Sequence, residues 1–151
     1  MIKNIFETAT VNELTERLHL IKADTTPLWG KMDAAQMMAH CCVSYEMIYD
    51  DIHPKPGLLK KWLLRAFIKP IVTGETTYPK NSRTAQEFII NSHKNFEAER
   101  NRLLAYINRA QKNGSDFFEG KNSHSFGPLT ALEWNNMLYK HLDHHLQQFG
   151  A

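Results

Sequence analysis

Residues 130–150 read TALEWNNMLYKHLDHHLQQFG, and this stretch carries the local signals on which the fold prediction rests. Thr130 and Glu133 stand at the spacing of a capping box, in which two side chains satisfy free backbone N–H groups at the start of a helix. Gly150 suits the other end, because glycine readily adopts the left-handed conformation that terminates many helices. The stretch therefore predicts a helix over about residues 130–149.

The same capping signal occurs three more times, each time ahead of an amphipathic run: TVNE at 10–13, DAAQ at 33–36 and TAQE at 84–87. These signals predict helices over about residues 10–23, 33–51 and 84–112. The third contains four apolar residues at helical spacing that we expect in the core, Phe88, Phe96, Leu103 and Ile107. Strand signals are scarce. We therefore expect an all-α fold, a four-helix bundle that spans residues 1–151 as a single domain.

The connection between the second and third helices, about residues 52–83, is too long to be structureless in a compact domain. Within it, GLLKKWLLRAFIK at residues 57–69 predicts a short extra helix that ends before Pro70. The short connection ahead of the second helix makes the first two helices antiparallel, whereas the long crossover makes the second and third parallel. The bundle is therefore expected to run up-down-down-up.

The extra helix carries a basic row beside several apolar residues, namely Lys61, Arg65 and Lys69 beside Trp62, Leu63, Phe67 and Ile68. A basic amphipathic helix can touch a membrane surface or an acidic partner. The alternative is a helix that caps the bundle with its lysines in solvent. The width of the apolar sector favours the second interpretation, because so many apolar side chains need burial.

Composition narrows the class of protein. Lys and Arg number 18 against 16 Asp and Glu, a formal net charge of +2, which argues against a nucleic-acid partner. No apolar run approaches the roughly 18 residues of a membrane span, and no signal-peptide core is present, so no membrane partner is expected. Cys41 and Cys42 are adjacent, an arrangement that rarely forms a disulfide, so we expect a cytoplasmic protein.

The last predicted helix contains three histidines within five residues, His141, His144 and His145. Positions four apart stack on one face of a helix with Cβ atoms about 5–6 Å apart, so His141 and His145 can share one metal ion, while His144 lies towards the flank. The pair continues the apolar stripe of Trp134 and Leu138, where buried imidazoles each need a partner. Alone the HxxxH spacing is a weak signal, and it lacks the glutamate of a metalloprotease.

A third histidine is predicted to reach the same place. His40 lies about 10 Å from the start of the second helix, and His141 with His145 lies about 10 Å from the end of the last. If these helices are antiparallel, the three imidazoles meet at one level. Neighbouring Cys41 and Cys42 diverge from His40 by about 100° or more and are expected to be core residues instead.

The stretches WGKMDAAQMMAHC (29–41) and FGPLTALEWNNMLYKHLDHHLQQFG (126–150) resemble the DinB/YfiT-like metalloenzymes, in particular a small bacterial branch of unknown function, over nearly the whole chain. The resemblance implies the long-crossover bundle, a metal triad of His40, His141 and His145, and Gln148 three residues after the last ligand. It also implies a homodimer. Characterised members include thiol-cofactor transferases and a thiol-dependent isomerase, while many others have no assigned activity. The resemblance therefore implies no single reaction, and a low-molecular-weight thiol is one candidate for a small-molecule substrate.

Other residues are candidates for the mouth of the site. The helix connections at the metal end contain Trp29 and Gly30, and further on Tyr78, Asn81 and Arg83. Arg83 could hold a carboxylate, although a surface arginine is the plainer interpretation. His93 could be a fourth ligand or proton shuttle, or simply a solvated side chain. His124 is expected at the opposite end.

Three hypotheses follow for function. Three neutral imidazoles leave at least one open coordination position, the pattern of a catalytic site, with zinc or nickel as the first choices and iron after them. The first hypothesis is a metal-dependent transferase or hydrolase that activates a small thiol or water. The second is a metal-binding stress or accessory protein without turnover, and the third is a bundle whose histidines only fill space.

Overall fold

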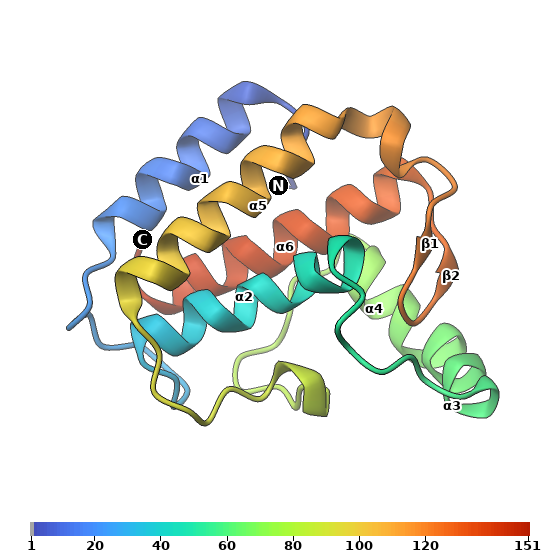
Figure 1. The fold of residues 1–151 in the computed structure, drawn as a ribbon, viewed down its shortest axis with the longest axis horizontal. Coiled ribbons are helices and arrows are strands. Elements are labelled where there is room, and N and C mark those ends of the chain that lie inside the picture. The colour runs from blue at the N-terminus through green and yellow to red at the C-terminus, as the bar shows by residue number, and fades with distance from the viewer. Residues whose placement is uncertain (1) are drawn as a thin grey trace.

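Four long helices lie side by side in the computed structural model, which describes residues 2–151 (Figure 1). They are α1 (Thr8–Leu20), α2 (Ala34–Tyr49), α5 (Phe96–Phe118) and α6 (Ala131–Gln148). In Figure 1, α1 and α6 run towards the end that holds the C-terminus, and α2 and α5 run away from it. The predicted, mostly helical fold is confirmed.

Two of the four predicted capping boxes form, and they begin α2 and α6. The Asp33 side chain accepts the backbone N–H of Gln36 at 2.7 Å, and the Gln36 side chain accepts the N–H of Asp33 at 3.1 Å. Thr130 and Glu133 exchange the equivalent bonds. The box predicted at Thr10 is wrong, because α1 already begins at Thr8 and has no side-chain cap.

The third predicted helix starts later than expected, but its first helical stretch ends at the non-helical Gly114, close to the expected end near residue 112. Its first turn was predicted at Thr84, but α5 begins at Phe96, where the Asn95 side chain accepts the N–H of Ala98 at 2.9 Å. The helix then continues through a kink at Gly114 to Phe118. The predicted start is wrong because residues 84–95 cross the bundle instead, forming only a 3-10 turn, η2 (Gln86–Phe88), that contacts α2.

The crossover, residues 50–95, contains the predicted extra helix in three pieces: α3 (Leu58–Leu63), a π-helical turn η1 (Leu64–Ile68) and α4 (Lys69–Thr73). This crossover helix, residues 58–73, continues past Pro70, which occupies the first turn of α4, where a missing N–H costs little. The predicted burial of its apolar sector is wrong: no residue of α3 or η1 is buried.

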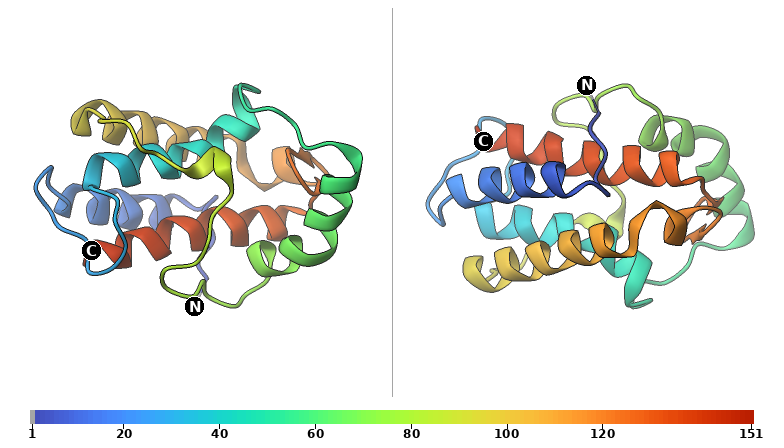
Figure 2. Two further views of the ribbon diagram at one scale, coloured as in Figure 1. Left: turned by 90° about the horizontal axis from the view of Figure 1, so that it is seen from below. Right: turned by 90° about the horizontal axis from the view of Figure 1, so that it is seen from above.

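The buried Lys140 of α6 anchors the end of the crossover helix to the bundle. Its ammonium group donates to the backbone carbonyls of Ile71, Gly74 and Thr76. A second bond, from the Asn136 side chain to the carbonyl of Thr73 at 2.9 Å, supports the same junction. These contacts fix the crossover against α6, at the end of the bundle away from the C-terminus (Figure 2).

A short antiparallel hairpin, β1 (Asn122–Ser123) with β2 (Gly127–Pro128), joins α5 to α6 and was not predicted. The core between the four helices includes Phe96, Leu103 and Ile107 as expected, whereas Phe88 lies in the crossover. Cys41 and Cys42 are buried in the core, as expected. Within residues 2–151, no helix is long and apolar enough to cross a bilayer.

Candidate metal centre

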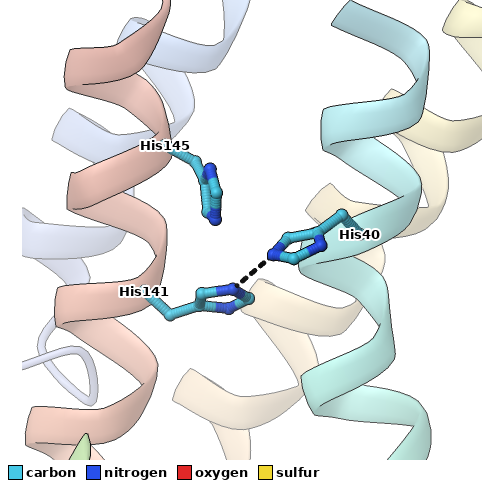
Figure 3. Close-up of side chains that lie close together, drawn as sticks. All are labelled: His40, His141 and His145. Carbon is cyan, nitrogen blue, oxygen red and sulfur yellow. Dashed lines mark hydrogen bonds between the residues drawn. The ribbon is translucent and has the colours of Figure 1, made fainter. Parts of the chain in front are cut away.

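Three imidazoles from α2 and α6 converge on one point, as the sequence predicted (Figure 3). One ring nitrogen from each of His40, His141 and His145 lies within 4.8 Å of the other two. The Nε2 atoms of His40 and His141 are 3.0 Å apart. His40 and His145 are buried, and His141 is partly exposed. The convergence requires α2 and α6 to lie antiparallel, as Figure 1 shows, with both histidine turns at the same level, as the labelled side chains in Figure 3 show.

Each of the three rings is oriented by a hydrogen bond at its other nitrogen. The Nδ1 atom of His40 bonds to the carbonyl of Phe88 at 2.8 Å, and that of His145 to Gln148 Oε1 at 2.7 Å. The Nδ1 atom of His141 lies 3.0 Å from Ser44 Oγ. Such outer bonds fix the ring orientation and the tautomer of metal-binding histidines, and they leave Nε2 for the ion.

The protonation of two rings follows from their partners. A carbonyl oxygen only accepts, so Nδ1 of His40 must carry the hydrogen, and its Nε2 presents a lone pair. The Gln148 amide donates to the carbonyl of Trp29 at 2.7 Å, which turns its oxygen towards His145. His145 therefore also donates from Nδ1 and presents its Nε2 lone pair to the centre.

The Ser44 hydroxyl can act in two ways at His141. If it donates to Nδ1, then Nε2–H of His141 can donate to His40, but the lone pair of His145 gains no partner from that bond. If it accepts from Nδ1, three lone pairs face one another and repel unless a cation lies between them. The donor set thus fits a single divalent cation better than it fits the metal-free network.

Burial keeps all three rings neutral, the form that binds metal. It lowers the pKa of His40, lowers that of His141 well below its usual range, and lowers that of His145 to about 3. The neighbouring imidazoles of the centre lower the pKa of His141 and His145 further, because two adjacent imidazolium charges repel.

Gly30 brings the α1–α2 loop close to this network. Its φ of +86° is a left-handed conformation, and a Cβ atom built there would lie 2.5 Å from Gln148 Nε2. No real Cβ contact is that short. Glycine is therefore required both for the backbone conformation and for the approach that lets Trp29 accept from Gln148.

A cavity of about 1010 Å³ opens from the three histidines. Its walls come from α2, α6, the crossover and the hairpin, and they are predominantly apolar. A mostly apolar cavity of this size with a few convergent polar groups is typical of small-molecule sites. Six of the predicted mouth and pocket residues line it, namely Trp29, Gly30, Tyr78, Asn81, Arg83 and Gln148, whereas the seventh, His93, does not.

Two other histidines lie away from the three-imidazole centre. His93 is exposed in the stretch before α5 and borders a separate small hollow, which agrees with the solvated alternative and not with a fourth ligand or proton shuttle. His124, expected at the far end, lines the cavity from the hairpin and bonds through Nε2 to the carbonyl of His53 at 3.3 Å. The hairpin lies at the end of the bundle away from the C-terminus, where His124 was expected (Figure 1), and the cavity extends to it.

Three residues near the centre were missed by sequence reasoning as site residues. Ser44 stands four residues after His40 on the same face of α2, a spacing that could have revealed it. The contribution of Phe88 is a backbone carbonyl, which has no sequence signal. His144 lines the cavity with its ring 5.1 Å from that of His145, between the rings of Trp29 and Tyr78.

Comparison with known proteins gives a family without an assigned activity. The model of a protein family described as "Protein of unknown function (DUF1569)" matches residues 6–151. No curated protein and no solved structure matches the chain. The resemblance to the DinB/YfiT-like group stays a prediction. Since the match covers nearly the whole sequence, the chain belongs to the DUF1569 family.

Proposed function

We propose that this protein is a metal-dependent enzyme in which His40, His141 and His145 hold one divalent cation and leave a coordination position open to the cavity. The observation that carries the proposal is the orientation of the three rings. Their Nε2 atoms converge, and each Nδ1 atom is bonded to an oxygen. Buried imidazoles need a partner in any role, but here the outer bonds of His40 and His145 leave two lone pairs directed at one point, an arrangement that a space-filling cluster does not need.

Neutral imidazoles suit zinc and nickel first, and iron after them. When bound, such an ion lowers the pKa of a thiol or water in its open position, so that a nucleophile exists near neutral pH. The surrounding chain would orient the substrate. The apolar walls exclude water. Arg83 at the mouth would bind an anionic group of the substrate, and His144 would exchange a proton with the substrate.

The reaction we propose is a transfer reaction on a small thiol, with hydrolysis as the variant in which water is activated. The resemblance to thiol-dependent DinB/YfiT-like enzymes supports this choice, together with the matched positions of the triad and Gln148. That resemblance also supports an up-down-down-up bundle and a homodimer, which sedimentation velocity would test. The unpaired Cys41 and Cys42 support a reducing, cytoplasmic location.

Metal content tests the site itself. The purified wild-type protein is expected to bind close to one equivalent of zinc or nickel, and the double variant His40→Ala, His141→Ala is expected to bind almost none. His93→Ala is the matched control, because that histidine lies outside the cavity. A double variant that kept stoichiometric metal would eliminate the proposed site, and a wild-type protein without metal would favour a purely structural role.

A second function, metal binding without turnover, is favoured by one observation. Within residues 2–151, Glu87 is the sole carboxylate that lines the cavity, and it faces Lys60 at 3.7 Å rather than the centre. A site with a single carboxylate in its lining suits storage or sensing as well as catalysis. A screen for consumption of common thiols and electrophiles, with the double variant as blank, separates the two. No turnover with zinc, nickel or iron would support the second function.

A further inference from the structure

The outer surface of the crossover helix is apolar and uncovered. Leu58 is 89% exposed, Leu59 74%, Trp62 63% and Phe67 64%, and Leu63 beside them is 43% exposed. We call these five residues the outer apolar face. All five are exposed on one helix, whereas Leu64, Ile68 and Ile71 of the same helix line the cavity, so the five belong to its outward side. A continuous apolar surface of this kind marks an interaction site.

The opposite side of the same helix is apolar as well. Leu64, Ile68 and Ile71 line the cavity. A helix on the surface of a soluble protein normally has one apolar stripe and a polar opposite side. This helix already uses its inner stripe as a cavity wall, so the outer apolar face has no partner within residues 2–151.

The charge of the helix indicates what that partner is. Residues 57–74 contain no acidic residue, and Lys61 and Arg65 lie on the same helix as the outer apolar face, with the Arg65 guanidinium near Gly127 of the hairpin. Lys69 is ion-paired to Glu133 at 2.7 Å, and Lys60 faces Glu87. In a symmetric dimer through this face, the copy of the crossover helix would offer Lys61 and Arg65 no acidic partner, because residues 57–74 contain none. Anionic lipid headgroups match the charge, and the acyl boundary accepts Trp, Phe and Leu.

We propose that the crossover helix docks on an anionic lipid surface, with Trp62 and Phe67 inserted at the acyl boundary and with Lys61 and Arg65 among the headgroups. This surface lies in the membrane interface and does not span it. The sequence alone predicted no membrane partner, because burial against the bundle was expected to hide these side chains. Their exposure in the structure removes that reason.

Co-flotation with vesicles tests the proposal on the full chain. We expect the wild-type protein to float with vesicles of phosphatidylcholine that contain roughly one third phosphatidylserine, and to float far less with phosphatidylcholine alone. The double variant Trp62→Ser, Phe67→Ser should lose at least roughly tenfold in affinity for the anionic vesicles. Leu20→Ser, Leu28→Ser is the matched control, because both leucines are 70% exposed at the opposite end of the bundle.

Charge reversal separates electrostatic from purely apolar adsorption. Lys61→Glu, Arg65→Glu should lower binding to the anionic vesicles roughly tenfold or more, and Lys22→Glu, Lys112→Glu, with the same change in net charge, should not. Circular dichroism confirms that each variant is folded. Binding that is equal on both vesicle types, or wild-type protein that does not float at all, overturns the proposal.

Sedimentation velocity tests the alternative that a second copy of this chain covers the outer apolar face. If wild-type protein is a dimer in solution and Trp62→Ser, Phe67→Ser makes it a monomer, the outer apolar face joins two copies and the lipid proposal fails. Vesicle binding should not depend on the proposed metal centre, because the metal ligands lie on α2 and α6. The variant His40→Ala, His141→Ala should therefore float like the wild type.

Discussion

Replacing Gly30 with alanine tests the link between the α1–α2 loop and His145. The new Cβ atom would lie 2.5 Å from Gln148 Nε2, so the Gln148 amide must move. That amide is bonded at 2.7 Å to the Trp29 carbonyl on one side and at 2.7 Å to His145 on the other. Its displacement removes the acceptor that orients the His145 ring.

Two effects of different size follow from this geometry. Alanine in the left-handed conformation costs about 1–2 kcal/mol of folding free energy. Loss of the outer bond of a metal-binding histidine lowers metal affinity about 10–100-fold, which corresponds to about 1.4–2.7 kcal/mol. Gly120→Ala is the control, because Gly120 has a φ of +70° and nothing within 4 Å of a Cβ atom. It should lose similar stability and no metal affinity.

Urea unfolding of the metal-free variants measures the first effect, and zinc titration against a competing chelator measures the second. The variant Gln148→Ala should reproduce the loss of affinity without the loss of backbone stability. If Gly30→Ala bound zinc as tightly as the wild type, or if Gly120→Ala lost as much affinity, the proposed path from Gly30 through Gln148 to His145 would be refuted.

Three further predictions concern the crossover, the caps and the thiols. Lys140→Met leaves three crossover carbonyls without their donor, so we expect a loss of about 1–3 kcal/mol in urea unfolding and faster tryptic cleavage of the crossover; unchanged cleavage would contradict the anchoring role. Thr130→Ala should cost about 1 kcal/mol, whereas Thr84→Ala should cost almost nothing because Thr84 caps no helix; equal losses would argue against this assignment of caps. Burial raises the pKa of Cys42 to about 12 and also raises that of Cys41, so both thiols should react with Ellman's reagent only on unfolding, and rapid labelling of the native protein would be evidence against their burial.

The parts of the fold that sequence predicted correctly are those decided by neighbouring residues. The capping boxes at Asp33 and Thr130 each need only residues three positions apart, and both form. The stretch that begins at Thr84 matches the same capping pattern, but no capping box forms there. There the chain is held against α2, where the Phe88 carbonyl accepts from His40, a contact between residues far apart in sequence. No local pattern carries that information.

The same division holds at the candidate site. Helical spacing places His141 and His145 on one face, and the depth of His40 in its own helix places it at their level, so the convergence could be predicted. Of the groups around the rings, Gln148 was expected from the resemblance and Ser44 stands at a helical spacing from His40. The backbone carbonyls of Phe88 and Trp29 could not be predicted, because a backbone carbonyl has no sequence signal. The exposure of Trp62 was missed for a related reason: its apolar helix has a partner on one side alone, and periodicity does not show which side.

The crossover helix separates the cavity from solvent. Its inner stripe lines the cavity, and its outer apolar face is exposed. Any ligand that fills the cavity and shifts this wall must change the affinity of the outer face for its own partner. Thermodynamic reciprocity then requires the outer partner to change the affinity for that ligand by the same factor. Ligand binding in the cavity and partner binding on the outer apolar face would then be coupled directly through the crossover helix.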